Sequence, residues 1–154
     1  MPTPPPYNIS ETIRHKKAQY IRAADTKQWA IFSSVLHPSL TASLHNTDGS
    51  VHRFSSREGY VEFLRKAFAD IGSIHVISSG ELKMRSGGEE GDGDAGDEDE
   101  VAAIWAMSYQ LGSLEGTGGY TEIGGGHYHE VWNRVDGEWV ISSLKFVNSF
   151  RKVL

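Results

Sequence analysis

The chain has 154 residues, of which 38% are hydrophobic and 10% aromatic, enough for a single domain with a buried core. It contains no cysteine, which excludes disulfides, thiolate catalysis and cysteine-ligated zinc and suits a cytoplasmic protein. No stretch approaches the roughly 20 apolar residues of a membrane span, so we expect no membrane partner. The formal net charge is −5, but eight of the 20 acidic residues lie within residues 89 to 100. The rest of the chain has 15 basic and 12 acidic residues, too small an excess for the basic face that nucleic acid requires.

The first helix is predicted over residues 9 to 24. Asn8 followed by Glu11 matches a capping box, and Ile9, Ile13 and Tyr20 recur near helical spacing. Residues 1 to 8, which are rich in proline, are then expected to form a short disordered lead to one domain over residues 9 to 154.

Two further helices are predicted before residue 72. Asp25 and Thr26 can cap a short helix that carries Trp29, Phe32 and Leu36 and ends before a proline. A second capping box, from residue 55 to residue 58, precedes an apolar stripe that runs to a glycine at position 72. Asp25 therefore lies where the first two helices meet.

The remaining segments have the composition of β-strands. Residues 40 to 45 and 51 to 54 flank a turn and predict a small hairpin. Four long segments rich in valine, isoleucine and aromatic residues predict an antiparallel meander: 74–84, 101–114, 120–135 and 138–150. Residues 86 to 100, "SGGEEGDGDAGDEDE", read as a flexible acidic loop. This order predicts an α+β fold, in which a cone-shaped, curved, mixed but mainly antiparallel sheet packs on three N-terminal helices around a pocket.

Two histidines follow three glycines in "EIGGGHYHEVW". Alternation along a strand sends His127 and His129 to one face and Tyr128 and Glu130 to the other, so only one pair can line the pocket. Two imidazoles are too few for a zinc site, and we expect no metal. The histidines are instead predicted on the convex face, which is exposed to solvent or to another subunit. The glycines before them would allow curvature and close backbone approach.

Four stretches, in this order and spacing, resemble one known family: "YIRAADTKQW", "SREGYVEFLRKAF", "IHVISSGEL" and "GGHYHEVWNRVDGEWVISSLK". The chain resembles the SnoaL-like family of the nuclear transport factor two-like superfamily, in its scytalone dehydratase-like branch, over about residues 9 to 150. The resemblance implies a pocket without cofactor, often in a homodimer or homotrimer. There, small organic molecules, commonly derived from polyketides or terpenoids, are dehydrated, cyclised or isomerised.

The resemblance also implies site residues. Asp25 and His75 match two catalytic positions of the dehydratase. Leu44 stands where that enzyme has a tyrosine, and its second histidine falls near Tyr109, so scytalone dehydration itself is not expected. Tyr128 occupies the position at which the family has an asparagine that faces the pocket. Further residues are expected to bind the substrate: Tyr20, Trp29, Leu44, Trp105, Tyr109 and Glu130.

Chemistry at these positions follows from the pairing of a carboxylate with an imidazole. Asp25 can hold one nitrogen of His75 and raise the basicity of the other, which gives a general base. Tyr128 or Tyr20 can donate a hydrogen bond to a carbonyl oxygen. We expect a cofactor-independent lyase or isomerase acting on a small apolar organic molecule. The alternatives are a non-catalytic binding or oligomerisation module of the same fold, and an interaction protein that uses the acidic loop.

Overall fold

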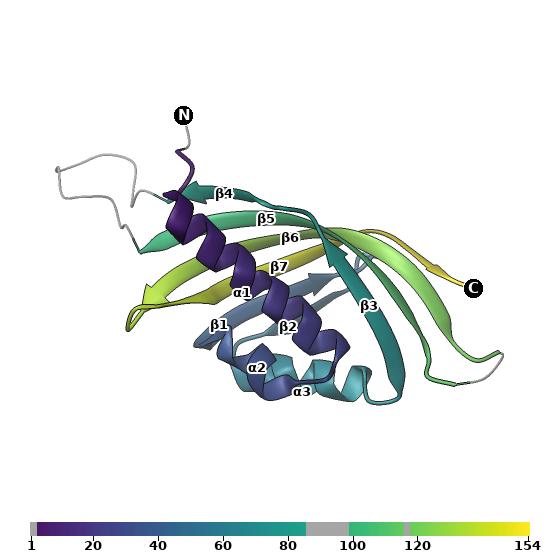
Figure 1. Cartoon of the computed structure of the whole chain (residues 1–154). Helices are drawn as coiled ribbons and strands as arrows, with labels where there is room; N and C mark the ends of the chain where they lie inside the picture. The colour runs from purple at the N-terminus through teal and green to yellow at the C-terminus, as the bar shows by residue number, and fades with distance from the viewer. Residues whose placement is uncertain (1–2, 86–98, 116–117) are drawn as a thin grey trace.

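The computed structural model describes residues 3–85, 99–115 and 118–154. Within these residues, a curved sheet wraps around three helices (Figure 1). The helices are α1 (Tyr7–Asp25), α2 (Trp29–Ser34) and α3 (Arg57–Ala67). The strands are β1 (Leu36–His45), β2 (Val51–Phe54), β3 (Ile71–Ile77), β4 (Glu81–Met84), β5 (Glu100–Ser113), β6 (Thr121–Val135) and β7 (Glu138–Val153). Most of the predicted acidic loop, residues 86–98, lies outside the described residues, and its last residue, Glu100, opens β5.

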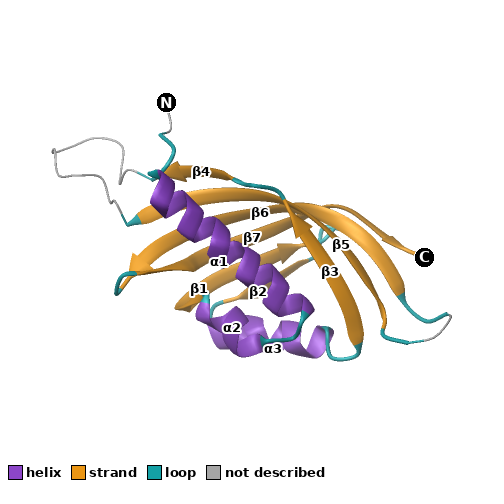
Figure 2. Ribbon diagram, in the orientation of Figure 1, coloured by secondary structure: helices purple, strands orange, loops and turns teal. Residues whose placement is uncertain are grey.

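The sheet has the order β2-β1-β7-β6-β5-β3, and β4 also pairs with β5. The predicted meander is present as β3 to β7, and the predicted small hairpin joins it because β1 runs parallel to β7. The helices all lie on the inner side of the curved sheet (Figure 2). The α+β fold with a mixed curved sheet on N-terminal helices is therefore confirmed. No helix of the described ranges is long and apolar enough to cross a membrane.

The first helix begins two residues earlier than predicted. Pro6 is its N-cap residue, and the Pro6 carbonyl accepts hydrogen bonds at 3.0 Å from the backbone N–H groups of Ile9 and Ser10. Proline is compatible with this position because its ring fixes φ near the −50° that Pro6 adopts and because the helix needs no N–H group there. The predicted capping box from Asn8 is therefore wrong. Residues 7 and 8 are helical, and the Thr3 carbonyl accepts a hydrogen bond from the Met84 N–H, so residues 3 to 8 are not a disordered lead.

The second helix and the following strand also differ from expectation. Gln28 is the N-cap of α2, so Asp25 does not cap it. The helix ends at Ser34, and Leu36, predicted to be helical, opens β1 instead. The register of β1 against β7 shifts between Leu36 and Thr41, around a proline that has no N–H for the ladder. Because Asp25 does not cap α2, its carboxylate can accept hydrogen bonds from other residues.

Gly80 divides the predicted long strand over residues 74 to 84 into β3 and β4. Its backbone is left-handed, with φ of +80°, and a Cβ atom there would overlap the indole ring of Trp105. Trp105 is almost fully buried in the core. The sheet edge therefore bends at Gly80, where the lack of a side chain leaves room for the Trp105 ring.

Replacement of Gly80 by alanine should destabilise the fold by about 2 to 4 kcal/mol, because left-handed strain and overpacking against Trp105 add. Gly49 is the matched control, since its φ is +88° and a Cβ atom added there would meet no other atom within 4 Å. Gly49→Ala should cost only the strain, about 1 to 2 kcal/mol. Urea unfolding of both variants measures the difference, and equal costs would show that contact with Trp105 is not limiting.

A buried ion pair joins α1 to the sheet. The Lys17 ammonium on α1 contacts the Glu130 carboxylate on β6, and both side chains are fully buried. Glu130 also accepts hydrogen bonds from the indole nitrogens of Trp105 at 2.8 Å and Trp132 at 2.9 Å. Burial lowers the pKa of Lys17, and the charge of Glu130 acts against that shift. Each charge is tolerated in the core because the other compensates it.

Removal of one partner of this pair leaves an uncompensated charge in the core. Lys17→Met and Glu130→Gln should each destabilise the fold by about 3 to 5 kcal/mol. The double variant should be more stable than the sum of the single costs predicts, because it leaves no lone charge. Chemical denaturation of the four proteins gives this coupling, and additive costs would argue against a direct interaction.

Candidate functional site

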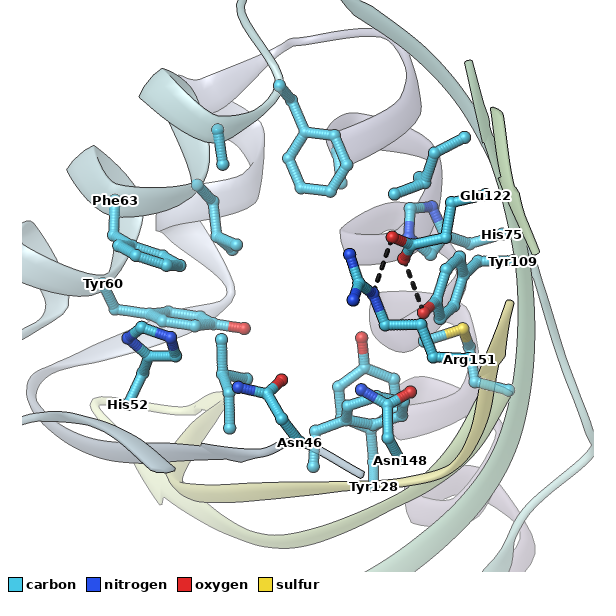
Figure 3. Close-up of a pocket in the computed structure, with 18 of the residues that line it drawn as sticks. Asn46, His52, Tyr60, Phe63, His75, Tyr109, Glu122, Tyr128, Asn148 and Arg151 are labelled. Atoms are coloured by element: carbon cyan, nitrogen blue, oxygen red, sulfur yellow. Dashed lines mark hydrogen bonds and ion pairs between the residues drawn. The ribbon is translucent and has the colours of Figure 1, made fainter. Parts of the chain in front are cut away.

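A cavity of about 500 Å³ opens between the inner face of the sheet and the helices. One side carries Tyr60 and Phe63 of α3, and the other carries His75, Tyr109 and Arg151 of the sheet (Figure 3). Its apolar lining includes Ile21, Leu44, Leu64, Phe68, Met107 and Phe146. A volume of this size is typical of pockets for small organic molecules.

Asp25 and His75 meet at this cavity. The His75 Nδ1 lies 2.5 Å from the Asp25 Oδ1, and the His75 backbone N–H donates to the Asp25 Oδ2 at 2.9 Å. Ser73 donates a third hydrogen bond to the Asp25 Oδ1 at 2.8 Å. Asp25 is the last residue of α1, and Ser73 and His75 are two residues apart on β3, so both side chains turn to the same face. The two positions that resemble catalytic residues are therefore brought together.

The dyad is well shielded from solvent, since the side chains of His75 and Asp25 are only 10% and 11% exposed. Partial burial acts to raise the pKa of the Asp25 carboxyl, but hydrogen bonds from His75 and Ser73 outweigh it and hold that pKa below the ordinary value. An ionised Asp25 favours the tautomer with its proton on Nδ1. The Nε2 lone pair of His75, which lines the cavity, is then free to accept a proton.

Three phenol groups, those of Tyr20, Tyr60 and Tyr128, line the same cavity as His75. The Tyr20 and Tyr60 hydroxyls are 2.6 Å apart, and the ring of Tyr128 meets that of Tyr20 edge to face at 6.2 Å. The hydroxyls of Tyr60 and Tyr128 point into the cavity (Figure 3). Burial raises the pKa of each of the three phenols, so they stay protonated and can donate hydrogen bonds.

Lys17 supports the ring of Tyr128. Its ammonium lies 3.5 Å from the centre of the Tyr128 ring and 4.2 Å from that of the Tyr20 ring. The cation therefore stabilises the π faces of both rings while Glu130 holds it in place. Sequence reasoning missed Lys17, although it occupies a position within the apolar stripe of the first helix.

Three residues expected to bind the substrate lie elsewhere. Glu130 is enclosed by Lys17 and two indoles, and Trp105 packs over Gly80 and donates its N–H to Glu130. Trp29 packs edge to face on Phe32, with ring centres 5.3 Å apart, and Phe32 rather than Trp29 lines the cavity. Alternation correctly placed Glu130 and Trp105 on the inner face. It could not show that α1 covers that end of the face.

Tyr20, Leu44, Tyr109 and Tyr128 do line the cavity. Tyr109 donates a hydrogen bond from its hydroxyl to the Glu122 Oε2 at 2.8 Å. A Cβ atom at Gly124 would overlap this hydroxyl, so the first of the three glycines makes room for the Tyr109 ring. Gly126 likewise admits the backbone of Val147, so the predicted close backbone approach at these glycines is confirmed.

Glu122, Arg151, Asn148 and Tyr60 are cavity residues that sequence reasoning missed. Glu122 has the same parity on its strand as Tyr128, so alternation along β6 was a usable signal. Arg151 gave no such signal. In the register of β6 with β7, Gly126 faces Asn148 and Gly125 faces Phe150, which leaves an extra residue, Ser149. This bulge reverses the alternation and turns Arg151 inward.

His127 and His129 are exposed on the outer face, where the alternation predicted them, while Tyr128 and Glu130 are buried on the inner face. The described ranges contain no group of three or more histidine or carboxylate side chains arranged to hold a metal ion.

Comparison with known proteins places this site in a family. The SnoaL-like domain matches residues 8–145. The chain is 37% identical over 149 residues to "Probable cyclase FGR4" of Gibberella zeae, covering 92% of each chain. Among solved structures it resembles the Kfla4162 protein of Kribbella flavida, with a TM-score of 0.74, 18% identity and coverage of 92% and 91%. It also resembles the hexachlorocyclohexane dehydrochlorinase LinA-type3 of Novosphingobium barchaimii, with a TM-score of 0.73, 16% identity and coverage of 94% and 88%.

At these identities the two structural likenesses concern the fold alone. A scytalone dehydratase-like protein of Novosphingobium aromaticivorans has the same fold, with a TM-score of 0.72, 14% identity and coverage of 92% and 85%. The family match extends over most of the chain, and the relative from Gibberella zeae agrees with it over nearly the full length. The chain belongs to the SnoaL-like family, with the fold of nuclear transport factor two-like proteins.

Proposed function

We propose that the protein is a cofactor-independent lyase or isomerase in which His75 is the general base. The observation that carries this proposal is the 2.5 Å contact between Asp25 and the Nδ1 of an imidazole that lines the cavity. The Nε2 of His75 removes a proton from carbon next to a carbonyl group, or returns one to a leaving hydroxyl. Asp25 orients the ring and stabilises the imidazolium that forms.

The phenol groups stabilise negative charge in this proposal. When the base removes a proton next to a carbonyl, charge develops on the carbonyl oxygen as an enolate. Tyr128, with the Tyr20 and Tyr60 pair beside it, donates hydrogen bonds to that oxygen. Their protonated state suits donation, and the apolar walls exclude water that would weaken it.

The relatives support this reaction class. The relative with 37% identity is named a cyclase, and structures with the same fold include a dehydrochlorinase and a scytalone dehydratase-like protein. All three names describe rearrangement or elimination. We propose a small apolar organic substrate, of the kind found in polyketide metabolism, and a homodimer or homotrimer, which the exposed Ile74, Val76 and Phe150 on the outer face of the sheet favour.

The rival proposal is a binding module that keeps the fold without chemistry. It would be favoured by a cavity filled with side chains or by a His75 that lies away from it. The open cavity and the imidazole on its wall favour the enzyme instead.

Proton abstraction can be tested with 5-nitrobenzisoxazole, a flat apolar probe. A base removes its C3 proton, the N–O bond breaks, and the electron pair ends on a phenolate oxygen. The wild-type protein should accelerate this ring opening above the buffer rate. His75→Gln should reduce that acceleration by about 100-fold or more, because the imidazole that acts as the base is removed. Asp25→Asn should reduce it less. Absorbance of the phenolate follows the rate.

His129→Gln, on the outer face, is the matched control and should leave the rate unchanged. Equal rates for wild type and His75→Gln would refute the assignment of the base.

The pH dependence of unfolding provides a separate test of Asp25. Because its pKa is lowered on folding, its stabilising contribution is present above the ordinary aspartate value, about 3.9, and is lost as the pH falls through the lowered value. Stability of Asp25→Asn should therefore depend less on pH in that acidic range.

Tyr128→Phe should slow the same ring opening by about 10- to 100-fold, because the forming phenolate loses a hydrogen-bond donor in the cavity. Tyr7→Phe is the control, since Tyr7 is 80% exposed. Steady-state kinetics should show the change mainly in kcat, as expected for an interaction made in the transition state. A change confined to KM would make Tyr128 a binding residue only.

A further inference from the structure

The rim of the cavity on the sheet side carries a second polar cluster, separate from the dyad. Glu122 accepts hydrogen bonds from Tyr109 at 2.8 Å and from the Arg151 Nε at 2.7 Å, and Tyr120 also donates to it. The Arg151 Nη2 contacts the Tyr120 hydroxyl at 3.0 Å. Glu122 is buried, while the Arg151 side chain is 46% exposed. The carboxylate therefore serves as a fixed support for the guanidinium.

Two members of this cluster, Tyr109 and Arg151, lie on the same row of the sheet as His75. His75 faces Tyr109 in the register, Tyr109 faces Gly124, and Gly124 faces Arg151. All the side chains of this row turn to the inner face. The guanidinium extends into the cavity (Figure 3). Nε and Nη2 contact Glu122 and Tyr120, and Nη1 makes no hydrogen bond to the described residues, so both of its N–H groups can donate to a bound molecule.

The charge of Arg151 is compensated by the carboxylate that it contacts. Two carboxylates of the cavity lining, Glu122 and Asp48, stand against this one guanidinium. Hydrogen bonds from Ser50 are the main cause of the lowered pKa of Asp48. A bound anion would meet a guanidinium whose charge the buried Glu122 already compensates. An uncharged acceptor, such as a carbonyl oxygen, would gain the hydrogen bond without repulsion from Glu122.

Asn148 supplies an acceptor in the same part of the cavity. Its Oδ1 is buried and has no hydrogen-bond partner among the described residues. Asn148 pairs with Gly126 and Arg151 pairs with Gly124, so the two residues are two pairs apart in the ladder, and both line the cavity. A buried acceptor without a donor is unfavourable, and a ligand hydroxyl would satisfy it.

We propose that Arg151 and Asn148 select the substrate of the proposed reaction, which is an uncharged aromatic compound carrying both a carbonyl and a hydroxyl group. The Arg151 Nη1 donates to the carbonyl oxygen, and the Asn148 Oδ1 accepts from the hydroxyl. The aromatic walls formed by Tyr60, Phe63 and Phe68 hold the rings. This inference rests on the proposed function for the identity of the reacting molecule, but binding itself requires no turnover.

Isothermal titration with four naphthalene probes tests the selection. The probes are 6-hydroxy-2-acetonaphthone, 2-acetonaphthone without the hydroxyl, 2-naphthol without the carbonyl, and 6-hydroxy-2-naphthoate with an anion. Wild-type protein should bind the first about 3- to 10-fold tighter than the second or third, as one hydrogen bond each predicts. It should bind the naphthoate at least about 10-fold more weakly than the first probe. Glu122→Gln should narrow that last gap by removing one negative charge.

The variants assign each hydrogen bond. In Asn148→Leu, or Asn148→Ala if the first folds poorly, the hydroxyl should no longer improve affinity, so 6-hydroxy-2-acetonaphthone should bind no better than 2-acetonaphthone. In Arg151→Met the carbonyl should no longer improve affinity, while binding of 2-naphthol stays at its wild-type level. Arg65→Met, an exposed arginine on α3 that pairs with Glu62, is the matched control and should change nothing.

Two results would overturn the selection: hydroxyl and carbonyl effects that persist unchanged in the variants, or tighter binding of the naphthoate that disappears in Arg151→Met, which would make the cluster an anion site. Either result can occur while the rate of ring opening of 5-nitrobenzisoxazole still depends on His75. Conversely, selective binding without any dependence of ring opening on His75 would leave this inference standing and remove the proposed function.

Discussion

The structure depends on the contact of Asp25 with β3. One carboxylate at the end of α1 accepts from Ser73, from the His75 backbone and from the His75 ring. These bonds tie the helix to the edge of the sheet and set the imidazole on the cavity wall. Two turns earlier on the same helix, Lys17 binds Glu130 on β6. The helix is therefore held at its C-terminal end and near its middle, and the space between it, α3 and the sheet remains open as the cavity.

The cavity combines apolar walls with a few polar groups, each supported from behind. Asp25 supports His75, Glu122 supports Tyr109 and Arg151, and Lys17 supports Tyr128. In each case a charged or polar partner, largely shielded from solvent, fixes the group that faces the cavity. Such support keeps a site in one geometry, because a supported side chain has few alternative rotamers. Backbone features contribute equally, since Gly124 leaves room for the Tyr109 ring.

Much of this arrangement could be predicted from local patterns. Alternation on β6 separated Tyr128 from His127 and His129, and the resemblance to a known family placed Asp25 and His75 at one site. Predictions failed where they relied on capping rules alone. Asp25 was expected to cap α2 and Asn8 to cap α1, yet neither does. An aspartate at a helix end has several possible partners, and only the position of β3 decides among them.

The sequence by itself determined most of the elements, the inner and outer faces of β6 and the family, because periodicity and motif order are local properties that survive without knowledge of contacts. Only the tertiary structure decided which inner-face residues reach the cavity. Glu130 and Trp105 share a face with Tyr128 and Tyr109, but Glu130 is enclosed by Lys17 of α1 and by the indole of Trp105, whereas Tyr128 and Tyr109 line the cavity. Arg151 reaches the cavity because Ser149 bulges from the ladder and reverses the alternation. Coverage by a distant helix and a shift of register both arise from pairing between segments far apart in the chain, which no local pattern encodes.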